Sequence, residues 1–207
     1  MLFLGYDPGG DAANGAAILS VNNDVRSLQA ATLGSVDDTL EWFDVCLGSS
    51  IPDAIGIDSF LSWETGPSGW RGPDKWLREM YPSTKKSVMA SNSTFGSMAV
   101  QGMAMAIRLR DRFDQIVLNE THPKVLYHAL TGEHYSFPGL NNQMVDWLQD
   151  IIAVPAMPDT LTDHAWDAAI SAWVTYKGYK TGFSPDLMSK ANNPILPAGE
   201  VNYYWPN

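Results

Sequence analysis

The stretch Leu2-Phe3-Leu4-Gly5-Tyr6-Asp7-Pro8-Gly9-Gly10 consists of a short apolar run, an aspartate at its end, and a turn of proline and glycines that follows at once. A run bounded in this way is typical of a buried strand, and we expect it to be the first and central strand of a sheet. A carboxylate at the end of a buried strand is expensive to desolvate unless a metal ion, an arginine or backbone N–H groups neutralise it. Asp7 is therefore either one member of a larger acidic site or a cap for the turn that Pro8 begins.

Length and composition indicate one globular domain. The chain has 207 residues, of which 45% are apolar and 17% charged, and this is enough for a single sizeable core. We expect residues 1–178 to form the domain and residues 179–207 to be an irregular tail, packed on the domain or on a partner subunit of a homodimer. The single cysteine, Cys46, excludes an internal disulfide and a thiolate-rich metal site. Without a leader pattern or an apolar run of about 18 residues, we expect no signal peptide or membrane contact and a cytoplasmic location.

The distribution of charge leaves two interpretations of the surface open. A net charge of −10 argues against a generic nucleic-acid-binding surface, because phosphate contacts dominate such binding. Eight of the 13 basic residues, however, fall in one segment: Arg71, Lys75, Arg78, Lys85, Lys86, Arg108, Arg110 and Arg112. This basic segment either steers a phosphate backbone to one face of the protein or simply forms solvated helix faces.

The order of the predicted elements is three strands linked by short turns, followed by helices that alternate with two further strands. The strands are expected at residues 2–7, 14–21, 25–33, 54–58 and 116–120. The helices are expected at residues 36–47, 74–80, 95–113, 123–130, 142–152 and 163–178, with N-caps at Ser35, at Ser93 or Thr94, and at Thr162. Most of residues 59–93 form a long irregular excursion, and excursions of that length are usually functional or mobile.

Acidic residues stand at the C-terminal ends of three predicted strands and near the start of the last helix. Asp7, Asp58 and Glu120 end strands, and neighbouring parallel strands would place such groups side by side. The helix dipole alone accounts for Asp163 in the first turn of the last helix. It accounts less well for Asp167, one turn further along on a face of small alanines that we expect to approach the sheet. The sequence therefore predicts one cluster of carboxylates.

This order of elements resembles the ribonuclease-H-like fold, an α/β fold with a mixed five-stranded sheet flanked by helices. More narrowly, the chain resembles a family of nucleases of that fold that are predicted from sequence and have no known function. The last matching motif is also similar to that of the RuvC-type resolvases, in which an Asp or His precedes a final Asp by three residues. The motifs span residues 3–176 and are Gly5-Tyr6-Asp7-Pro8-Gly9, Ile55-Gly56-Ile57-Asp58-Ser59, Arg71-Gly72-Pro73-Asp74 with Arg78, Asn119-Glu120-Thr121-His122-Pro123, and His164-Ala165-Trp166-Asp167-Ala168-Ala169.

The resemblance implies a metal-dependent nuclease that acts on nucleic acid. It implies that Asp7, Asp58 and Asp167 bind Mg²⁺ or Mn²⁺ and that Glu120 is a fourth catalytic acid. His164 stands where many relatives carry an aspartate, and it is a further candidate metal ligand. Two divalent ions held by oxygen ligands can activate a nucleophile and stabilise the leaving oxygen of a phosphodiester.

Three further residues, Arg71, Arg78 and His122, belong to the motifs of the narrower family and are candidates for binding substrate. Either arginine could bind a phosphate, because guanidinium groups match phosphate oxygens in geometry and charge. An equally good interpretation of Arg71 is a structural ion pair with Asp74 that clamps the loop.

Two other classes of function stay open at this point. A binding or scaffolding protein with a catalytically degenerate site would fit the acidic net charge. The actin-like ATPases and sugar kinases share the same core and use an Asp-x-Gly turn on phosphates, as Asp7-Pro8-Gly9 could. They generally need two such domains, however, and 207 residues hold only one.

Overall fold

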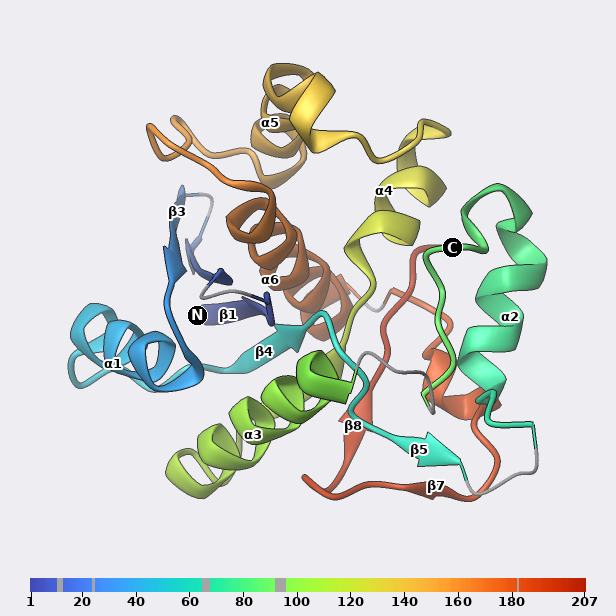
Figure 1. Cartoon of the computed structure of the whole chain (residues 1–207). Helices are drawn as coiled ribbons and strands as arrows, with labels where there is room; N and C mark the ends of the chain where they lie inside the picture. Colours follow the sequence, from blue (N-terminus) through green and yellow to red (C-terminus); the bar gives the residue numbers. More distant parts are fainter. Residues whose placement is uncertain (11–12, 24, 65–67, 92–95, 182) are drawn as a thin grey trace.

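A six-stranded mixed sheet with helices on both faces forms the centre of the molecule (Figure 1). The computed structural model describes the whole chain except residues 11–12, 24, 65–67, 92–95 and 182. The elements are β1 (Leu2–Asp7), β2 (Asn14–Asn22), β3 (Val25–Leu33), α1 (Val36–Leu47), β4 (Ala54–Ile57), β5 (Trp63–Glu64), α2 (Gly72–Met80), the 3₁₀ helix η1 (Pro82–Thr84), α3 (Gly96–Arg112), β6 (Val117–Glu120), α4 (Pro123–Thr131), α5 (Phe137–Ile152), α6 (Asp163–Thr181), the 3₁₀ helix η2 (Leu187–Lys190), β7 (Pro194–Ile195) and β8 (Val201–Asn202).

Strand β1 is central, as predicted. The strand order is β3-β2-β1-β4-β6-β8. The first three strands pair antiparallel, whereas β1, β4, β6 and β8 run parallel. The carboxyl ends of β1, β4 and β6 therefore meet at one edge of the sheet, which is where ligands bind in parallel sheets.

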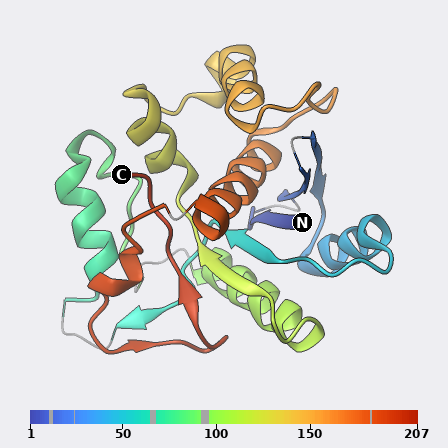
Figure 2. The ribbon, with the colours of Figure 1, turned by 180° about the vertical axis from the view of Figure 1, so that it is seen from behind.

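The sheet has six strands, so the predicted number of five is wrong. The sixth strand comes from the tail, where Val201 and Asn202 pair with Leu118 and Asn119 of β6. The tail also supplies β7, which pairs with β5 from the long excursion after β4. Figure 2 shows the C-terminal segment returning beside β6. Tyr203 and Trp205 are buried, and the Trp205 indole N–H donates to the Tyr81 hydroxyl at 3.0 Å.

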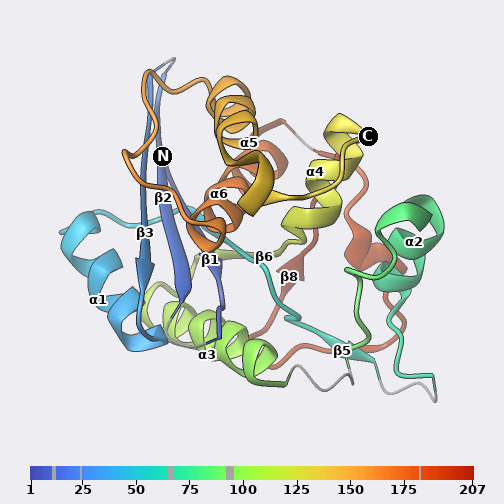
Figure 3. The same cartoon turned by 45° about the horizontal axis from the view of Figure 1, so that its top comes forward.

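Alternate residues of the strands supply two hydrophobic cores, one on each face of the sheet. Leu4 and Tyr6 pack with residues of α1 and α3, whereas Phe3 packs on the opposite face with α4, α5 and α6. Figure 3 shows α1 and α3 on one side of the strands and α5 and α6 on the other. Helix α1 begins as predicted, with the Ser35 hydroxyl accepting the Asp38 N–H at 3.1 Å.

Helix boundaries differ from the predicted ones mainly at the start of α5 and the end of α6. Helix α5 begins at Phe137 rather than near residue 142, and α6 continues to Thr181. The predicted cap of α3 at Ser93 or Thr94, and the predicted first residue Phe95, lie outside the described residues. Thr162 caps α6 as expected, because its hydroxyl accepts the Ala165 N–H at 3.1 Å.

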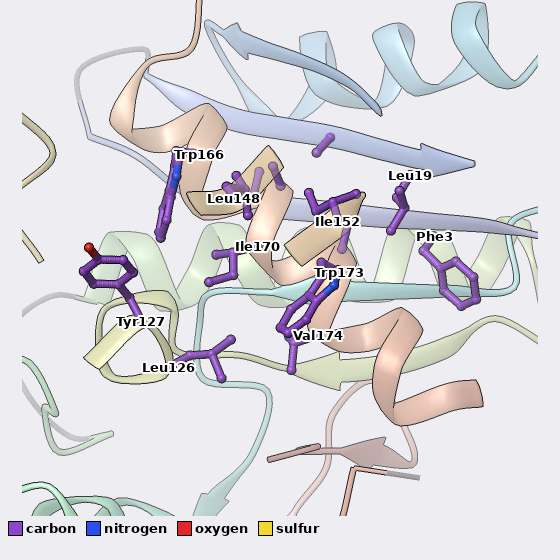
Figure 4. Close-up of a cluster of buried hydrophobic side chains, with 14 of the residues drawn as sticks. Phe3, Leu19, Leu126, Tyr127, Leu148, Ile152, Trp166, Ile170, Trp173 and Val174 are labelled. Carbon is purple, nitrogen blue, oxygen red and sulfur yellow. The ribbon is translucent and has the colours of Figure 1, made fainter. Parts of the chain in front are cut away.

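Helix α6 is buried on nearly all sides and joins the sheet to α4 and α5. Its alanines face the strands, while its large side chains, Trp166, Ile170 and Trp173, meet α4 and α5 (Figure 4). Both indole N–H groups donate to carbonyls of α5, from Trp166 to Met144 and from Trp173 to Ile151, each at 3.0 Å. Among the described residues, no helix is both long enough and apolar enough to cross a bilayer.

Candidate metal centre

Glycines on three adjacent strands allow α6 to lie directly on the sheet. A Cβ atom on Gly5 would lie 1.8 Å from the Ala168 carbonyl oxygen, and a Cβ atom on Gly15 would lie 1.9 Å from that of His164. At Gly56 a Cβ atom would lie 2.3 Å from the Ser171 carbonyl oxygen. Any larger residue would push the helix away, because real atoms do not approach so closely. The glycines therefore determine how near the first turns of α6 come to the ends of β1 and β4.

The predicted convergence of Asp7, Asp58 and Asp167 is confirmed. Asp7 ends β1, Asp58 follows β4, and Asp167 lies in the second turn of α6. One carboxylate oxygen from each residue lies within 4.8 Å of the corresponding oxygens of the other two. Asp7 and Asp167 are only 2% and 4% exposed. We call these three residues the acidic triad.

Burial and mutual repulsion make the acidic triad electrostatically unfavourable when no cation is bound. Burial, followed by the charge of Asp7, raises the pKa values of Asp58 and Asp167 well above their usual range. Burial also raises the pKa of Asp7, although its hydrogen bond with His164 opposes this effect. Carboxylates held together in this way favour either protonation or a bound cation.

One buried oxygen of the acidic triad lacks a hydrogen-bond partner within the described part of the chain. It is Oδ1 of Asp167, which is buried. The neighbouring Tyr135 hydroxyl affects the pKa of Asp167, but the two groups do not have the geometry of a hydrogen bond. The Tyr135 hydroxyl also lacks a partner among the described residues. A buried polar atom without a partner is rare in folded proteins, and an ion that is not present in the coordinates is one of its common explanations.

Two basic side chains, His164 and Lys124, border the acidic triad. His164 Nδ1 lies 2.5 Å from Asp7 Oδ2, and this hydrogen bond raises the pKa of His164 against the opposing effect of burial. Burial lowers the pKa of Lys124, but the charges of Asp167, Asp58 and Asp7 outweigh it, so the pKa is raised. Because His164 Nδ1 is engaged with Asp7, the ring borders the triad in this structure and does not belong to the group of three.

Glu120, predicted as a fourth acid of the site, belongs to a separate ion-pair network. Glu120 is paired across the sheet with Ile57, and Ile57 is paired with Tyr6. Asp7 follows Tyr6 and Asp58 follows Ile57, so both aspartates are offset by one residue from Glu120. An offset of one residue turns a strand side chain to the opposite face. Both oxygens of Glu120 accept from the Arg71 guanidinium, at 2.5 and 2.8 Å.

Arg71 is buried and structural, so its predicted contact with a substrate phosphate is wrong and the loop-clamp interpretation is confirmed. Its Nε and Nη2 donate to Asp74 at 2.9 and 2.7 Å, and its Nη1 donates to the Ser62 carbonyl at 3.0 Å. Burial lowers the pKa of Arg71, but the charges of Glu120 and Asp74 and their hydrogen bonds together outweigh this, so the pKa is raised well above its usual range. The network holds the segment that follows Asp58, because Glu120 also accepts the Leu61 N–H at 2.9 Å.

The other two candidate substrate-binding residues lie near segment 85–88. The Arg78 guanidinium donates to the carbonyls of Lys85 and Val88, at 2.5 and 3.0 Å, and stacks 4.5 Å above the ring of Trp70. His122 Nε2 lies 3.1 Å from the Ser87 carbonyl oxygen. Burial, followed by the charge of Lys124, lowers the pKa of His122 to about 4, so the ring is neutral at pH 7.

The basic segment does not form one continuous surface. Arg71 is buried, and Arg108 and Arg112 at the C-terminal end of α3 pair with Asp37 and Asp44 of α1. Arg110 donates to the Glu200 carbonyl at 2.9 Å. The residues of the segment that are neither buried nor engaged by these partners come from α2 and the turn after it: Lys75, Arg78, Lys85 and Lys86.

Sequence reasoning missed two features of this region. Lys124 was not identified, although its position just after Pro123, in the first turn of the helix that follows a strand-end acid, was a usable signal. A cavity of about 280 Å³ beside Asp58 could not be anticipated, because its walls come from six separate segments of the chain. Comparison with protein-family models, curated proteins and solved structures finds no match to this chain. The geometry of the site therefore carries the functional inference.

Proposed function

We propose that this chain is a ribonuclease-H-like, metal-dependent nuclease that hydrolyses phosphodiester bonds. The observation that carries the proposal is the acidic triad, in which three carboxylates from three separate elements place oxygens within 4.8 Å of one another. Its position at the carboxyl ends of the parallel strands β1 and β4 supports the same reading.

The donor set fits Mg²⁺ or Mn²⁺. Both ions prefer hard oxygen ligands, and carboxylates are the usual protein ligands for them. The unpartnered Oδ1 of Asp167 and the raised pKa values of Asp58 and Asp167 are what a site short of a cation would show. Asp7, Asp58 and Asp167 would hold the ion, which when bound would supply an activated water and charge stabilisation at a phosphodiester.

The side chains around the acidic triad suit the handling of an anionic substrate. Lys124 lies near all three carboxylates and provides a positive charge that can attract a phosphate oxygen. His164 is fixed by Asp7, and its side chain remains 29% exposed, so the ring can hold a proton at the edge of the site. Its raised pKa keeps it protonated over more of the neutral range than a free histidine.

A catalytically degenerate binding protein of the same fold is the second candidate. The observation in its favour is the 2.5 Å contact between His164 and Asp7, since a protonated histidine can offset part of the triad's charge without a metal. The two candidates share the fold, but only the nuclease hydrolyses its substrate.

Cleavage assays on labelled single strands, duplexes and four-way junctions of DNA and RNA separate these candidates. We expect cleavage of at least one substrate with Mn²⁺ or Mg²⁺, none with EDTA, and none by Asp58→Asn. Asp37→Asn is the matched control, because the Asp37 side chain is 79% exposed on α1 and faces Arg108. Binding of Mn²⁺ without cleavage of any substrate would support the degenerate binder, and equal cleavage by Asp58→Asn would contradict the proposed site.

A further inference from the structure

The cavity beside Asp58 is a feature of the described surface that the proposed chemistry does not use. Its volume is about 280 Å³, and it opens next to the acidic triad because Asp58 belongs to both. Apolar side chains make up much of its wall, and they come from the segment after β4, the loop before α3 and α3 itself: Phe60, Met89, Met98 and Ala99. Cavities that bind small molecules commonly range from about 300 to 1,000 Å³. At about 280 Å³ this one lies just below the small end of that range, which suits one ring system and not several.

His122, a residue of the cavity wall, carries an unused hydrogen-bond acceptor. The Ser87 carbonyl can only accept, so Nε2 of the neutral His122 ring must carry the proton and donate to it at 3.1 Å. Nδ1 then presents a lone pair. This atom is buried and has no partner within the described part of the chain, and His122 lines the cavity. An acceptor in this state favours a ligand that brings an N–H donor.

Phe60 gives the cavity a braced aromatic wall. The Arg71 guanidinium lies 4.6 Å from the centre of the Phe60 ring and covers one of its faces. Arg71 is itself fixed by its hydrogen bonds to Asp74 and Glu120. A ring held in this way can pack against a flat ligand at little entropic cost, and aromatic walls of this type accept any base because every base has a π-face.

We infer that the cavity binds one unpaired nucleobase of the strand whose phosphate lies at the acidic triad, with His122 Nδ1 accepting a hydrogen bond from the base edge. Every base carries at least one N–H donor on its pairing edge, and in a duplex that edge is occupied and both faces are stacked. The substrate class is therefore a single strand, a loop or an extruded nucleotide. This inference rests on the proposed function, because the shared residue Asp58 is what connects the cavity to the scissile phosphate.

Three variants test the inference. Ala99→Phe fills the cavity from α3, and Val100→Phe is its matched control, because Val100 is the next residue of the helix and is 68% exposed. His122→Gln removes the acceptor at Nδ1 while its amide can still donate to the Ser87 carbonyl. Thermal melts establish that each variant is folded, and Mn²⁺ titration establishes that each retains the metal site.

Two binding measurements are made on each protein. The first uses Ca²⁺, to limit cleavage, with a fluorescent tetranucleotide and a fluorescent blunt duplex. The second uses free nucleosides with the metal-free protein, observed by ligand NMR, and this measurement needs neither metal nor phosphate.

We expect wild type and Val100→Phe to bind the tetranucleotide and at least one nucleoside, and to prefer the tetranucleotide to the duplex. We expect Ala99→Phe and His122→Gln to bind both ligands about tenfold or more weakly, with unchanged Mn²⁺ binding.

The outcomes distinguish this inference from the proposed function. If folded Ala99→Phe binds the tetranucleotide and the nucleosides as tightly as wild type, the cavity is not a base site, and the metal centre is unaffected by that result. A preference for duplex over single strand would also overturn the inference. If wild type binds nucleosides in a manner sensitive to Ala99→Phe but never binds Mn²⁺, the base site stands and the nuclease proposal fails.

Discussion

Replacing Asp167 with asparagine is expected to abolish metal-dependent cleavage and to raise the melting temperature of the metal-free protein. Loss of one metal ligand should remove several kcal/mol of transition-state stabilisation, which at about 1.4 kcal/mol per factor of ten is roughly a thousandfold or more in rate. The unliganded fold should gain stability, because Oδ1 of Asp167 has no partner in the described structure and its carboxyl is buried beside Asp7 and Asp58. Asparagine keeps the shape and removes the repulsion.

The dependence of stability on pH checks the physical reason for this effect. Folding raises the pKa values of Asp58 and Asp167, so the folded protein binds more protons than the unfolded chain and loses stability as pH rises. The raised pKa of His164 acts in the same direction above its ordinary value of 6.5. Folding lowers the pKa of His122 to about 4. This residue therefore makes the protein less stable as the pH falls, but only below pH 6.5.

Melts in EDTA at pH values rising from the ordinary range of a carboxyl group should therefore show wild type losing stability more steeply than Asp167→Asn, because the raised pKa of Asp167 is absent from the variant. Asp7→Asn is the informative comparison, because it relieves the same repulsion but gives up the 2.5 Å hydrogen bond to His164. Its gain in melting temperature should be the smaller of the two. A lower melting temperature for Asp167→Asn than for wild type in EDTA would contradict this view of the acidic triad.

Replacing Arg71 with methionine is expected to destabilise the protein by about 3–5 kcal/mol, because it leaves the buried carboxylates of Asp74 and Glu120 without their shared partner. Arg71 is fully buried and donates to both acids and to Ser62. Lysine should restore little of the loss, since a single ammonium cannot reproduce the planar set of donors. Denaturant unfolding of the metal-free protein measures the effect.

Two controls locate the origin of this loss. Arg108→Met removes a surface pair in which the two side chains are 59% and 79% exposed, and such pairs are worth about 0–1 kcal/mol. Adding Glu120→Gln to Arg71→Met should recover part of the stability, because one of the two unpaired charges is then gone. If Arg71→Met costs no more than Arg108→Met, or the second substitution brings no recovery, the ion-pair network does not hold the segment after Asp58.

The parts of the fold that sequence reasoning anticipated are those in which local pattern and packing agree. The apolar run ending at Asp7 forms the central strand β1, and the small residues along α6 lie on the sheet beside Gly5, Gly15 and Gly56. The convergence of Asp7 and Asp58 followed from strand ends that share one edge, and that of Asp167 from the small-residue face of α6 that lies on the sheet. These positions could be predicted from the sequence because strand order and the contact of α6 with the sheet bring them together.

The parts that could not be anticipated depend on register and on distant segments. Glu120 ends a strand just as Asp7 does, but only the pairing of Glu120 with Ile57 reveals that its side chain belongs to the Arg71 network. Strand β8 is only two residues long and has no alternating pattern to identify it. The position of His122 in a cavity with Phe60 and Met98 requires the complete tertiary structure.

A diffraction measurement on crystals soaked in Mn²⁺, recorded at a wavelength where manganese scatters anomalously, tests the metal centre most directly. We expect an anomalous peak bonded to oxygens of Asp7, Asp58 and Asp167, at distances of about 2.0–2.6 Å, because these oxygens already lie within 4.8 Å of one another. Asp167→Asn crystals treated in the same way should show a much weaker peak or none. A fully soaked wild-type crystal with no peak at the triad, and with Asp7 still bonded to His164, would contradict the central claim that this cluster binds a divalent cation.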